Sequence, residues 1–328
     1  MASKLAQLVA KYRELDIENQ INYDKFYLYS LITHSTAIEG STITELENQI
    51  MFDHGVSIKG KSIEEQSMNL DLKEAYDKAI MFAREHKPIS TDMLISLAAL
   101  VMKNTGKEYN TPLGTFSSAR GELRLLNVTA GFGGRSYMNY SKIPAKLEEF
   151  CQKLNAERAN KSSLSIEELY KITFDAHYNL VTIHPWADGN GRMARLVMNM
   201  LQFEFGLIPS KILKEDKEEY IKALVATRED DNLDIFRAFM SSMMERNIEN
   251  EITTYLNSID PEESRVKTTK SREKIIAFLS ENGKLSAVAL AEKIGISAKA
   301  VEKHLSNLKA EGMIERIGAA KGGYWRVK

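Results

Sequence analysis

Residues 184–195 bring together the groups of a site that could bind and attack a phosphate ester. Pro185 disfavours helical geometry in the residue before it, so a helix is expected to end near His184. The run DGNG at 188–191 accepts positive φ and lets backbone N–H groups converge on one point. A second helix that begins directly afterwards adds the free N–H groups of its N-terminus. The segment therefore predicts an anion-binding loop between two helices.

Four ionisable side chains of this segment fit chemistry on a polyphosphate. Arg192 and Arg195 lie at the start of the second helix, where a cation is disfavoured by about 0.3–1 kcal/mol unless an anion is bound. Their guanidinium groups carry a permanent charge and can donate paired hydrogen bonds to phosphate oxygens. Asp188 beside such phosphates is suited to hold a magnesium ion. His184, at the other rim of the loop, could accept a proton from an attacking hydroxyl.

Each of these features has an ordinary explanation when it stands alone. A single histidine is more often a core residue, an Asp-Gly or Asn-Gly pair is usually a turn, and arginines on a helix are usually solvated. A base, a metal ligand, an anion loop and two arginines within twelve residues are much harder to explain without a function. We therefore interpret the segment as a catalytic site.

The segment HPWADGNGRMAR resembles the signature of the Fic family, HPFxDGNGRxxR, with Trp186 where phenylalanine is usual. The resemblance extends over roughly residues 20–250. It implies a mainly α-helical core with a β-hairpin flap. It also implies a reaction that moves AMP from ATP to a hydroxyl side chain of another protein and releases pyrophosphate.

The resemblance implies a role for each motif residue. His184 would be the general base that deprotonates the target hydroxyl, and Asp188 would hold Mg²⁺ between the phosphates. The residues that would cradle or clamp the phosphates of ATP are Gly189, Asn190, Gly191, Arg192 and Arg195.

The run STAIEG at 35–40 resembles the inhibitory motif of the same family, [S/T]xxxE[G/N]. Ser35 and Glu39 are four residues apart and share a helix face, while Gly40 is typical of a helix stop. A carboxylate at the negative end of a helix is unfavourable and needs a partner. The resemblance names Arg195 as that partner, in a pair that lets ATP bind only unproductively. An inhibitory helix is thus expected at about residues 23–40.

Three weaker features bear on substrate binding. The apolar run at 123–128, flanked by Gly121 and by glycines at 131, 133 and 134, predicts one strand of a hairpin, which could pair with a target segment. The glycines at 131–134 lack nucleotide-loop spacing and are interpreted as turn residues. Tyr220 would contact adenine by resemblance, although a core position is equally expected. Arg228 stands where many relatives have asparagine, which leaves the choice of base open.

The elements that must position these residues are mostly helical. Apolar side chains follow a helical spacing from Tyr23 to Leu31 and again from Leu196 to Phe203. We expect an N-terminal helical region at 1–110 and a Fic-type core at 111–256. The polar stretch 257–269, which contains Pro261, predicts a linker.

Residues 270–328 are expected to form a small α+β domain of a different kind. They contain 12 Lys and Arg against 6 Asp and Glu, whereas the whole chain has a formal charge of −1. The order helix, helix, turn, helix, hairpin resembles a winged helix-turn-helix. Its third helix would direct Val301, Leu305 and Leu308 inward after a turn at Gly295 and an N-cap at Ser297. The basic charge favours DNA as the partner, while winged helices also mediate protein contacts.

The composition excludes several classes of protein. The single cysteine, Cys151, excludes a disulfide framework and a cysteine zinc site, and the six histidines form no HExxH motif. No apolar run approaches the roughly 20 residues of a membrane span, and charges interrupt the N-terminal apolar run. A cytoplasmic location and the absence of membrane contact are therefore expected.

The sequence thus predicts a self-inhibited adenylyltransferase that uses ATP and Mg²⁺. Its target would carry a Tyr, Thr or Ser hydroxyl and could be the protein itself, and a homodimer is allowed. One alternative is a transcription regulator whose Fic core only senses a nucleotide. Another is a Fic enzyme that transfers a different nucleotide, or that removes AMP with Glu39 positioning water.

Overall fold

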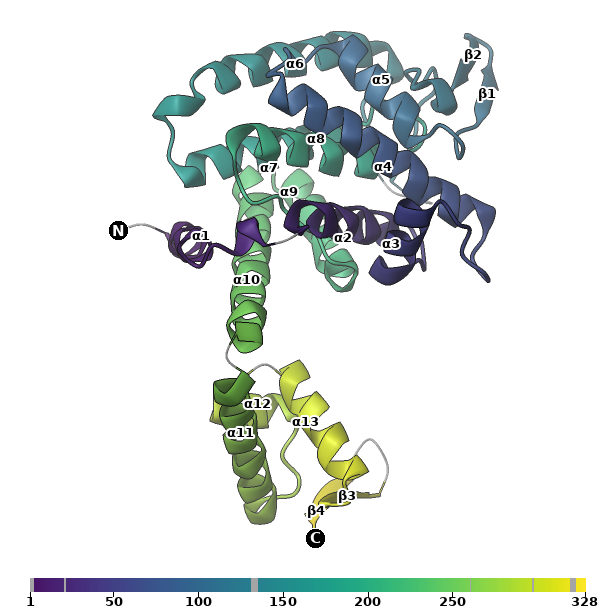
Figure 1. Cartoon of the computed structure of the whole chain (residues 1–328). Coiled ribbons are helices and arrows are strands. Elements are labelled where there is room, and N and C mark those ends of the chain that lie inside the picture. Colours follow the sequence, from purple (N-terminus) through teal and green to yellow (C-terminus); the bar gives the residue numbers. More distant parts are fainter. Residues whose placement is uncertain (1–2, 21, 131–134, 260, 297, 319–322) are drawn as a thin grey trace. The chain divides into compact units, whose positions relative to one another are not determined.

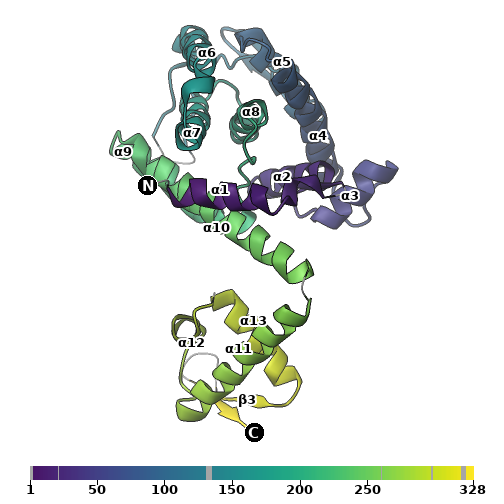
Figure 2. The ribbon, with the colours of Figure 1, turned by 60° about the vertical axis from the view of Figure 1, so that its left-hand side comes forward.

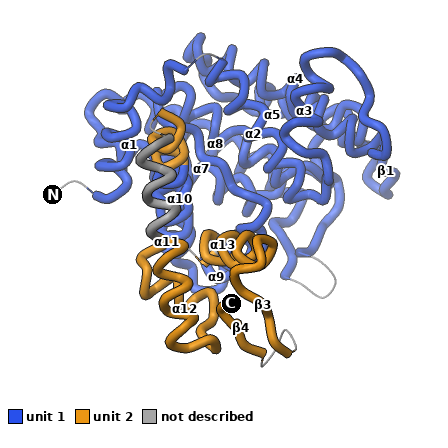
Figure 3. The backbone as a smooth tube through the Cα atoms, turned by 60° about the horizontal axis from the view of Figure 1, so that its bottom comes forward, with its two compact units in different colours: residues 1–250 blue, residues 251–328 orange. Residues whose placement is uncertain are grey.

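The computed structural model describes residues 3–20, 22–130, 135–259, 261–296, 298–318 and 323–328 (Figure 1). Residues 1–250 form one compact unit and residues 251–328 a second one (Figure 3). Both are mainly helical, and each includes a small antiparallel hairpin among its described residues. Among the described residues, no helix has the length and apolar character needed to cross a membrane.

Helix α8 (Asn190–Phe205) is the central element of the first unit. It packs against α7 (Ile166–Ile183) on one side and α4 (Ile63–Arg84) on the other (Figure 2). Nearly all of its residues from 190 to 202 are buried, as expected of a helix enclosed on all sides. Polar residues at its C-terminal half are satisfied internally, because Asn199 accepts from the Tyr76 hydroxyl at 2.6 Å and Gln202 accepts from the backbone N–H of Ser210 at 2.7 Å.

The hydrophobic core draws on both the N-terminal region and the motif-bearing half of the first unit. It joins Leu31 and Leu72 with Leu180 and Val197 in one cluster. The other helices of this unit are α1 (Lys4–Glu14), α2 (Tyr23–Ile38), α3 (Glu45–His54), α5 (Thr91–Val101), α6 (Ile143–Ala159), α9 (Lys217–Glu229) and most of α10 (Leu233–Ile259).

Capping boxes determine where three of these helices begin. Ser62 with Glu65, Ser165 with Glu168 and Thr44 with Glu47 start α4, α7 and α3 respectively. In each pair the hydroxyl accepts from the backbone N–H three residues on, and the glutamate accepts from the N-cap N–H.

The hairpin of the first unit lies earlier in the chain than predicted. Strands β1 (Glu108–Thr111) and β2 (Gly114–Ser117) pair antiparallel, with Glu108 opposite Ser117. The strand predicted at 123–128 is wrong, because Arg124 uses its backbone N–H to bond Pro185 O and its buried guanidinium to bond other loop carbonyls. Pairing begins only afterwards, at an isolated bridge between Thr129 and Ser136. The glycines at 131–134 lie outside the described residues.

Most of the segment predicted as a linker is helical. Helix α10 continues to Ile259 and α11 spans Pro261–Glu281, so residues 257–259 and 261–269 of the predicted linker belong to helices. Proline is favoured at the first position of a helix, and the following residues are rich in Glu, Arg and Lys, which have high helix propensity. Polar composition alone therefore did not distinguish a helix from a loop here.

The second unit has the predicted order of elements. After α11 come α12 (Ala287–Ile294), α13 (Ala298–Ala310), and strands β3 (Ile314–Ile317) and β4 (Tyr324–Val327), which pair antiparallel. Gly295 ends α12 at φ +79°, whereas the predicted N-cap Ser297 lies outside the described residues. The predicted inward residues Val301, Leu305 and Leu308 are all buried.

Gly121 gives a test of how closely the loop after β2 packs on α5. Its φ is +67°, and a Cβ at this position would lie 2.1 Å from Ile95 O and 2.7 Å from Ala99 N. Gly121→Ala should therefore lower the free energy of unfolding for two reasons. Overpacking should cost about 1–3 kcal/mol, and the left-handed backbone of an alanine should add its own conformational cost. The measurement is the urea concentration at the midpoint of unfolding of the first unit in the full chain, monitored by circular dichroism.

Gly55→Ala is the matched control, because Gly55 has φ +64° and nothing within 4 Å of a built Cβ. Its free energy of unfolding should fall only by the conformational cost of a left-handed alanine, about 1–2 kcal/mol. Equal losses in the two variants would contradict close packing at Gly121.

Candidate active site

His184 is the C-cap of α7 and takes a strained backbone conformation. Its φ is +52°, which is uncommon for a residue other than glycine. The backbone is held on both sides, because its N–H donates to Leu180 O at 3.0 Å and its carbonyl accepts from Arg124 Nε at 2.8 Å.

The imidazole of His184 is arranged as a neutral proton acceptor. Its Nδ1 lies 3.2 Å from Val181 O, a contact that requires the proton on Nδ1 and leaves the Nε2 lone pair available. The ring stacks on Tyr137 with a centroid separation of 3.7 Å. Burial lowers the pKa of His184 to about 4, so the ring is uncharged at neutral pH.

The loop after His184 is tied closed by Asn190 and anchored by Trp186. The Asn190 amide accepts from Trp186 N at 3.1 Å and donates to Trp186 O at 2.8 Å. The indole is buried and donates to Gly121 O at 2.9 Å. Gly189 takes φ +80°, and a Cβ there would lie 2.8 Å from Met102 Sδ, so the loop has no room for a larger residue.

Arg192 is a buried cation with few acceptors. Its guanidinium contacts Met102 Sδ at 3.0 Å and Val101 O at 3.4 Å, and Asp188 lies 3.8 Å away. Its Nε has no hydrogen-bond partner among the residues that the structure describes. Burial accordingly lowers the pKa of Arg192. A buried guanidinium left short of acceptors is suited to bind an anion.

Arg195 is fully engaged by the C-terminal end of α2. Its Nη2 donates to Glu39 Oε1 at 2.6 Å and to Ser35 O at 3.0 Å, and its Nε donates to Ser35 Oγ at 2.8 Å. Burial acts most strongly on Glu39 and raises its pKa, but the charge and hydrogen bond of Arg195, together with the charges of Arg192 and Lys217, hold the pKa below its usual value. The structure thus brings together the pair that the sequence predicted.

Gly191, directly before Arg192, leaves space for the pair of Glu39 and Arg195. A Cβ on Gly191 would lie 2.9 Å from Glu39 Oε1 and 3.1 Å from Arg195 Nη1. Any side chain there would push into the ion pair.

Tyr220 lies in the core behind Arg195. It is buried among aromatic rings that include Phe236, and its hydroxyl lies 3.0 Å from His177 Nε2 and accepts from Arg195. With its ring covered, Tyr220 offers no face for the predicted stacking on adenine. The next residue, Ile221, is the one that lines an open cavity.

That cavity lies beside the His184–Tyr137 stack and has a volume of about 110 Å³. The guanidinium of Arg228 stands 5.6 Å from the Tyr137 ring centroid. The cavity is lined by Ala130, Tyr137, Tyr178, Val181, Thr182, Ile221, Leu224, Val225 and Arg228. It is mostly apolar, with one cation and hydroxyl groups at its wall.

Asp188 fits a magnesium ion bound together with a phosphate. Its side chain is 60% exposed, and Oδ1 accepts from Gly189 N at 2.6 Å. The described residues contain no cluster of three or more His, Cys, Asp or Glu that could hold a metal alone. Magnesium needs no such cluster, because it commonly takes one or two carboxylates and completes its shell with phosphate oxygens and water.

Two residues that shape this site are not among those predicted from the sequence. Arg124, which donates to the His184 carbonyl, lies in the run predicted as a strand, and a charge inside an apolar run is the signal that points to it. Tyr137 covers the imidazole and left no signal in the sequence.

Comparisons with known proteins agree with this geometry. Residues 88–202 match the model of the Fic/DOC family, and residues 268–315 match a winged helix-turn-helix DNA-binding model. Protein adenylyltransferase fic-1 of Caenorhabditis elegans is 29% identical over 203 residues, which are 61% of this chain and 36% of that protein. The chain thus matches only about a third of the length of that relative.

Two solved structures share the fold. A Fic domain-containing signalling protein of Bacteroides thetaiotaomicron superimposes with a TM-score of 0.63 at 22% identity, over 76% of this chain and 97% of that one. Fic-1 of C. elegans, residues 134–508, gives 0.61 at 23% identity, over 78% of this chain and 72% of that one. From the site and these matches together, the chain contains a Fic domain, and a winged helix-turn-helix domain follows it.

Proposed function

We propose that the protein transfers AMP from ATP to a hydroxyl side chain of a protein and that Glu39 restrains this activity. The observation that carries the proposal is a neutral His184, its Nε2 available, beside a loop with a buried and underpartnered Arg192. The name of the C. elegans relative, protein adenylyltransferase, supports the same reaction.

The reaction uses the site as follows. The phosphates of ATP lie in the loop at 188–191, and Arg192 and Arg195 neutralise their charge. His184 Nε2 takes the proton of the target hydroxyl while the oxygen attacks the α-phosphorus. The bond from the α-phosphorus to the bridging oxygen breaks, and pyrophosphate leaves. Magnesium held by Asp188 would neutralise further negative charge on the phosphates.

Glu39 restrains the reaction by occupying Arg195. A guanidinium that donates to Glu39 and Ser35 cannot clamp a phosphate at the same time. The carboxylate would also repel a terminal phosphate placed there. ATP would therefore bind with its phosphates displaced until the end of α2 moves.

The alternative of a nucleotide sensor accounts for less of the site. A site that only binds a nucleotide has no use for a neutral base held by a strained backbone at His184. Removal of AMP from a modified protein stays a prediction about the same residues, and it would require Glu39 rather than only tolerate it.

A second candidate function rests on the second unit, which we propose binds DNA through α13. Val301, Leu305 and Leu308 face the core, while Lys303, Ser306, Asn307 and Lys309 are exposed. Exposed lysines and amides on the third helix of a winged helix suit phosphates and base edges in a major groove.

The transfer reaction is tested with ATP labelled on the α-phosphate and Mg²⁺, by following label on the protein itself. Wild type should label weakly, and Glu39→Gly at least about tenfold faster, because Arg195 is released for the phosphates. Adding His184→Ala to Glu39→Gly should lower the rate by about 10²–10⁴-fold, the contribution typical of a general base.

Glu85→Gly is the matched control. Glu85 is the C-cap of α4 with φ −79° and ψ −4°, close to the −83° and −4° of Glu39, and its carboxylate forms an ion pair with the surface residue Lys87. It should label like wild type. Absence of label in Glu39→Gly, with ATP still bound, would overturn the proposed transfer.

The protonation state of His184 can be measured directly. Its pKa of about 4 predicts that its Hε1 resonance, identified by its loss in His184→Ala, stays in the neutral position between pH 8 and pH 5.5. Because the pKa is lowered, protonation appears only as the pH falls toward 4. A midpoint near 6.5, the value of a solvated histidine, would contradict the neutral base.

DNA binding by the full chain is tested by fluorescence anisotropy with a labelled duplex at several salt concentrations. Lys303→Ala with Lys309→Ala should weaken binding severalfold and reduce the salt slope by about one per lost phosphate contact. Lys146→Ala, a surface change in the first unit, is the control. Unchanged affinity and slope in the double variant would count against α13 as the DNA-contacting helix.

A further inference from the structure

The end of the inhibitory helix is a tight turn that determines where Glu39 points. Helix α2 ends at Ile38, with Glu39 as its C-cap and Gly40 at φ +111°. Gly40 N donates to Ala37 O and Ser41 N to Thr36 O, both at 3.1 Å. This is the Schellman pattern, and it reverses the chain directly after Glu39.

One buried side chain, Asn69 of α4, holds this turn from both sides. Its Oδ1 accepts from Thr36 Oγ1 at 2.8 Å, and its Nδ2 donates to Ser41 Oγ at 3.1 Å. Thr36 and Ser41 are also joined to each other by the turn bond from Ser41 N to Thr36 O, and Glu39 lies between them in the sequence. All three hydrogen-bonding residues are fully or almost fully buried.

The remaining bonds of Asn69 fix its own orientation. Its Nδ2 also donates to Glu65 O at 2.8 Å, one turn earlier in α4, and its Oδ1 accepts from Asn48 Nδ2 at 2.8 Å. Asn48 in turn donates to Thr33 Oγ1 at 2.7 Å. The bonds to Glu65 and Asn48 thereby orient the amide through α4 and α3. Its bonds to Thr36 and Ser41 hold the last turn of α2 and the residues that follow it.

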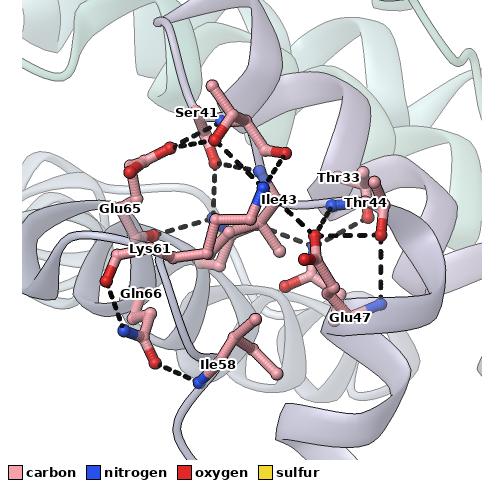
Figure 4. Close-up of polar contacts among 12 residues, drawn as sticks. Thr33, Ser41, Ile43, Thr44, Glu47, Ile58, Lys61, Glu65 and Gln66 are labelled. Atoms are coloured by element: carbon pink, nitrogen blue, oxygen red, sulfur yellow. Dashed lines mark hydrogen bonds and ion pairs between the residues drawn. The ribbon is translucent and has the colours of Figure 1, made fainter.

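Polar contacts continue the attachment beyond Ser41 (Figure 4). The Glu65 carboxylate accepts from Thr42 N and Thr42 Oγ1, both at 2.7 Å, and Lys61 Nζ donates to Thr42 O at 2.7 Å. The strand-like residues after the turn are therefore bound to the start of α4. The bonds of Glu65 and Lys61 lie at the surface, whereas those of Asn69 are excluded from water.

We infer that Asn69 is a positioning residue for Glu39, and that it sets how strongly the protein restrains itself. The inference rests on the proposed function. Asn69 touches neither Glu39 nor Arg195 in its hydrogen bonds; it acts by holding the turn that aims the carboxylate. Release of the turn would leave Arg195 free for a phosphate without altering any motif residue.

The first test compares self-labelling by wild type, Asn69→Ala and Ser41→Ala. Loss of the buried bonds should raise the rate about 5–10-fold in Asn69→Ala. The rise should be smaller in Ser41→Ala, which removes the bond from Asn69 to Ser41 Oγ and the local bond from Ile43 N but leaves the bond from Thr36 to Asn69. In the Glu39→Gly background, Asn69→Ala should add no further increase, since it acts through Glu39. An equal increase with and without Glu39 would overturn the inference.

Asn155→Ala is the matched control for lost stability. Asn155 also bridges two segments, because its amide bonds Ile89 N at 2.9 Å and Ile89 O at 2.8 Å, far from α2 in the chain. It should not change labelling. A similar rise in Asn155→Ala would assign the effect to general loosening and overturn the positioning role.

The second test does not depend on enzyme activity. Hydrogen exchange at the amides of Gly40 and Ser41 should be faster in Asn69→Ala than in wild type and unchanged in Asn155→Ala. Retained protection at both amides would overturn the inference. The two proposals can fail separately. If exchange is faster in Asn69→Ala but Glu39→Gly does not label, Asn69 still holds the turn, and only the proposed transfer reaction is overturned.

Discussion

A guanidinium enclosed by packed helices cannot return to water, so Arg195 must always have an anionic or carbonyl partner. In this structure Glu39 and Ser35 supply the acceptors. A phosphate in the neighbouring loop would supply the same kind of oxygen. We propose that the two partners compete for Arg195, so that restraint and activation are two ways of satisfying one buried charge.

The two sides of this competition are held by different forces. The loop and α8 belong to the hydrophobic core, with Trp186 buried against the loop after β2 and α8 covered by α4 and α7. The end of α2 is held by buried amide and hydroxyl groups around Asn69 as well as by the buried side chains of Ala37 and Ile38. We propose that release of Arg195 takes place at this polar attachment, because the loop and α8 are held by core burial.

His184 combines a left-handed backbone with burial, which suits the proton transfer that we propose for it. Its left-handed backbone is unfavourable, and burial penalises its charged form. The bonds from Arg124 to the His184 carbonyl and from Arg124 N to Pro185 O stabilise that conformation. A base held neutral in this way is ready to accept a proton at physiological pH.

Local chemistry in the sequence was enough to find the motif residues at 184–195, the Ser35–Glu39 helix face and the helical order of both units. These features depend on short spacings, on turn-forming glycines and on caps, which act within a few residues. It was not enough for Arg124, Tyr220 or the run at 123–128, whose side chains and backbone bond residues tens of positions away. Polarity around Pro261 was ambiguous because a solvated helix and a loop have the same composition. Which surface of an element is covered depends on partners that are distant in the chain. Tertiary packing alone therefore determined that Tyr220 is a buried hydrogen-bond partner of Arg195, and that Asn69 holds the turn at Glu39.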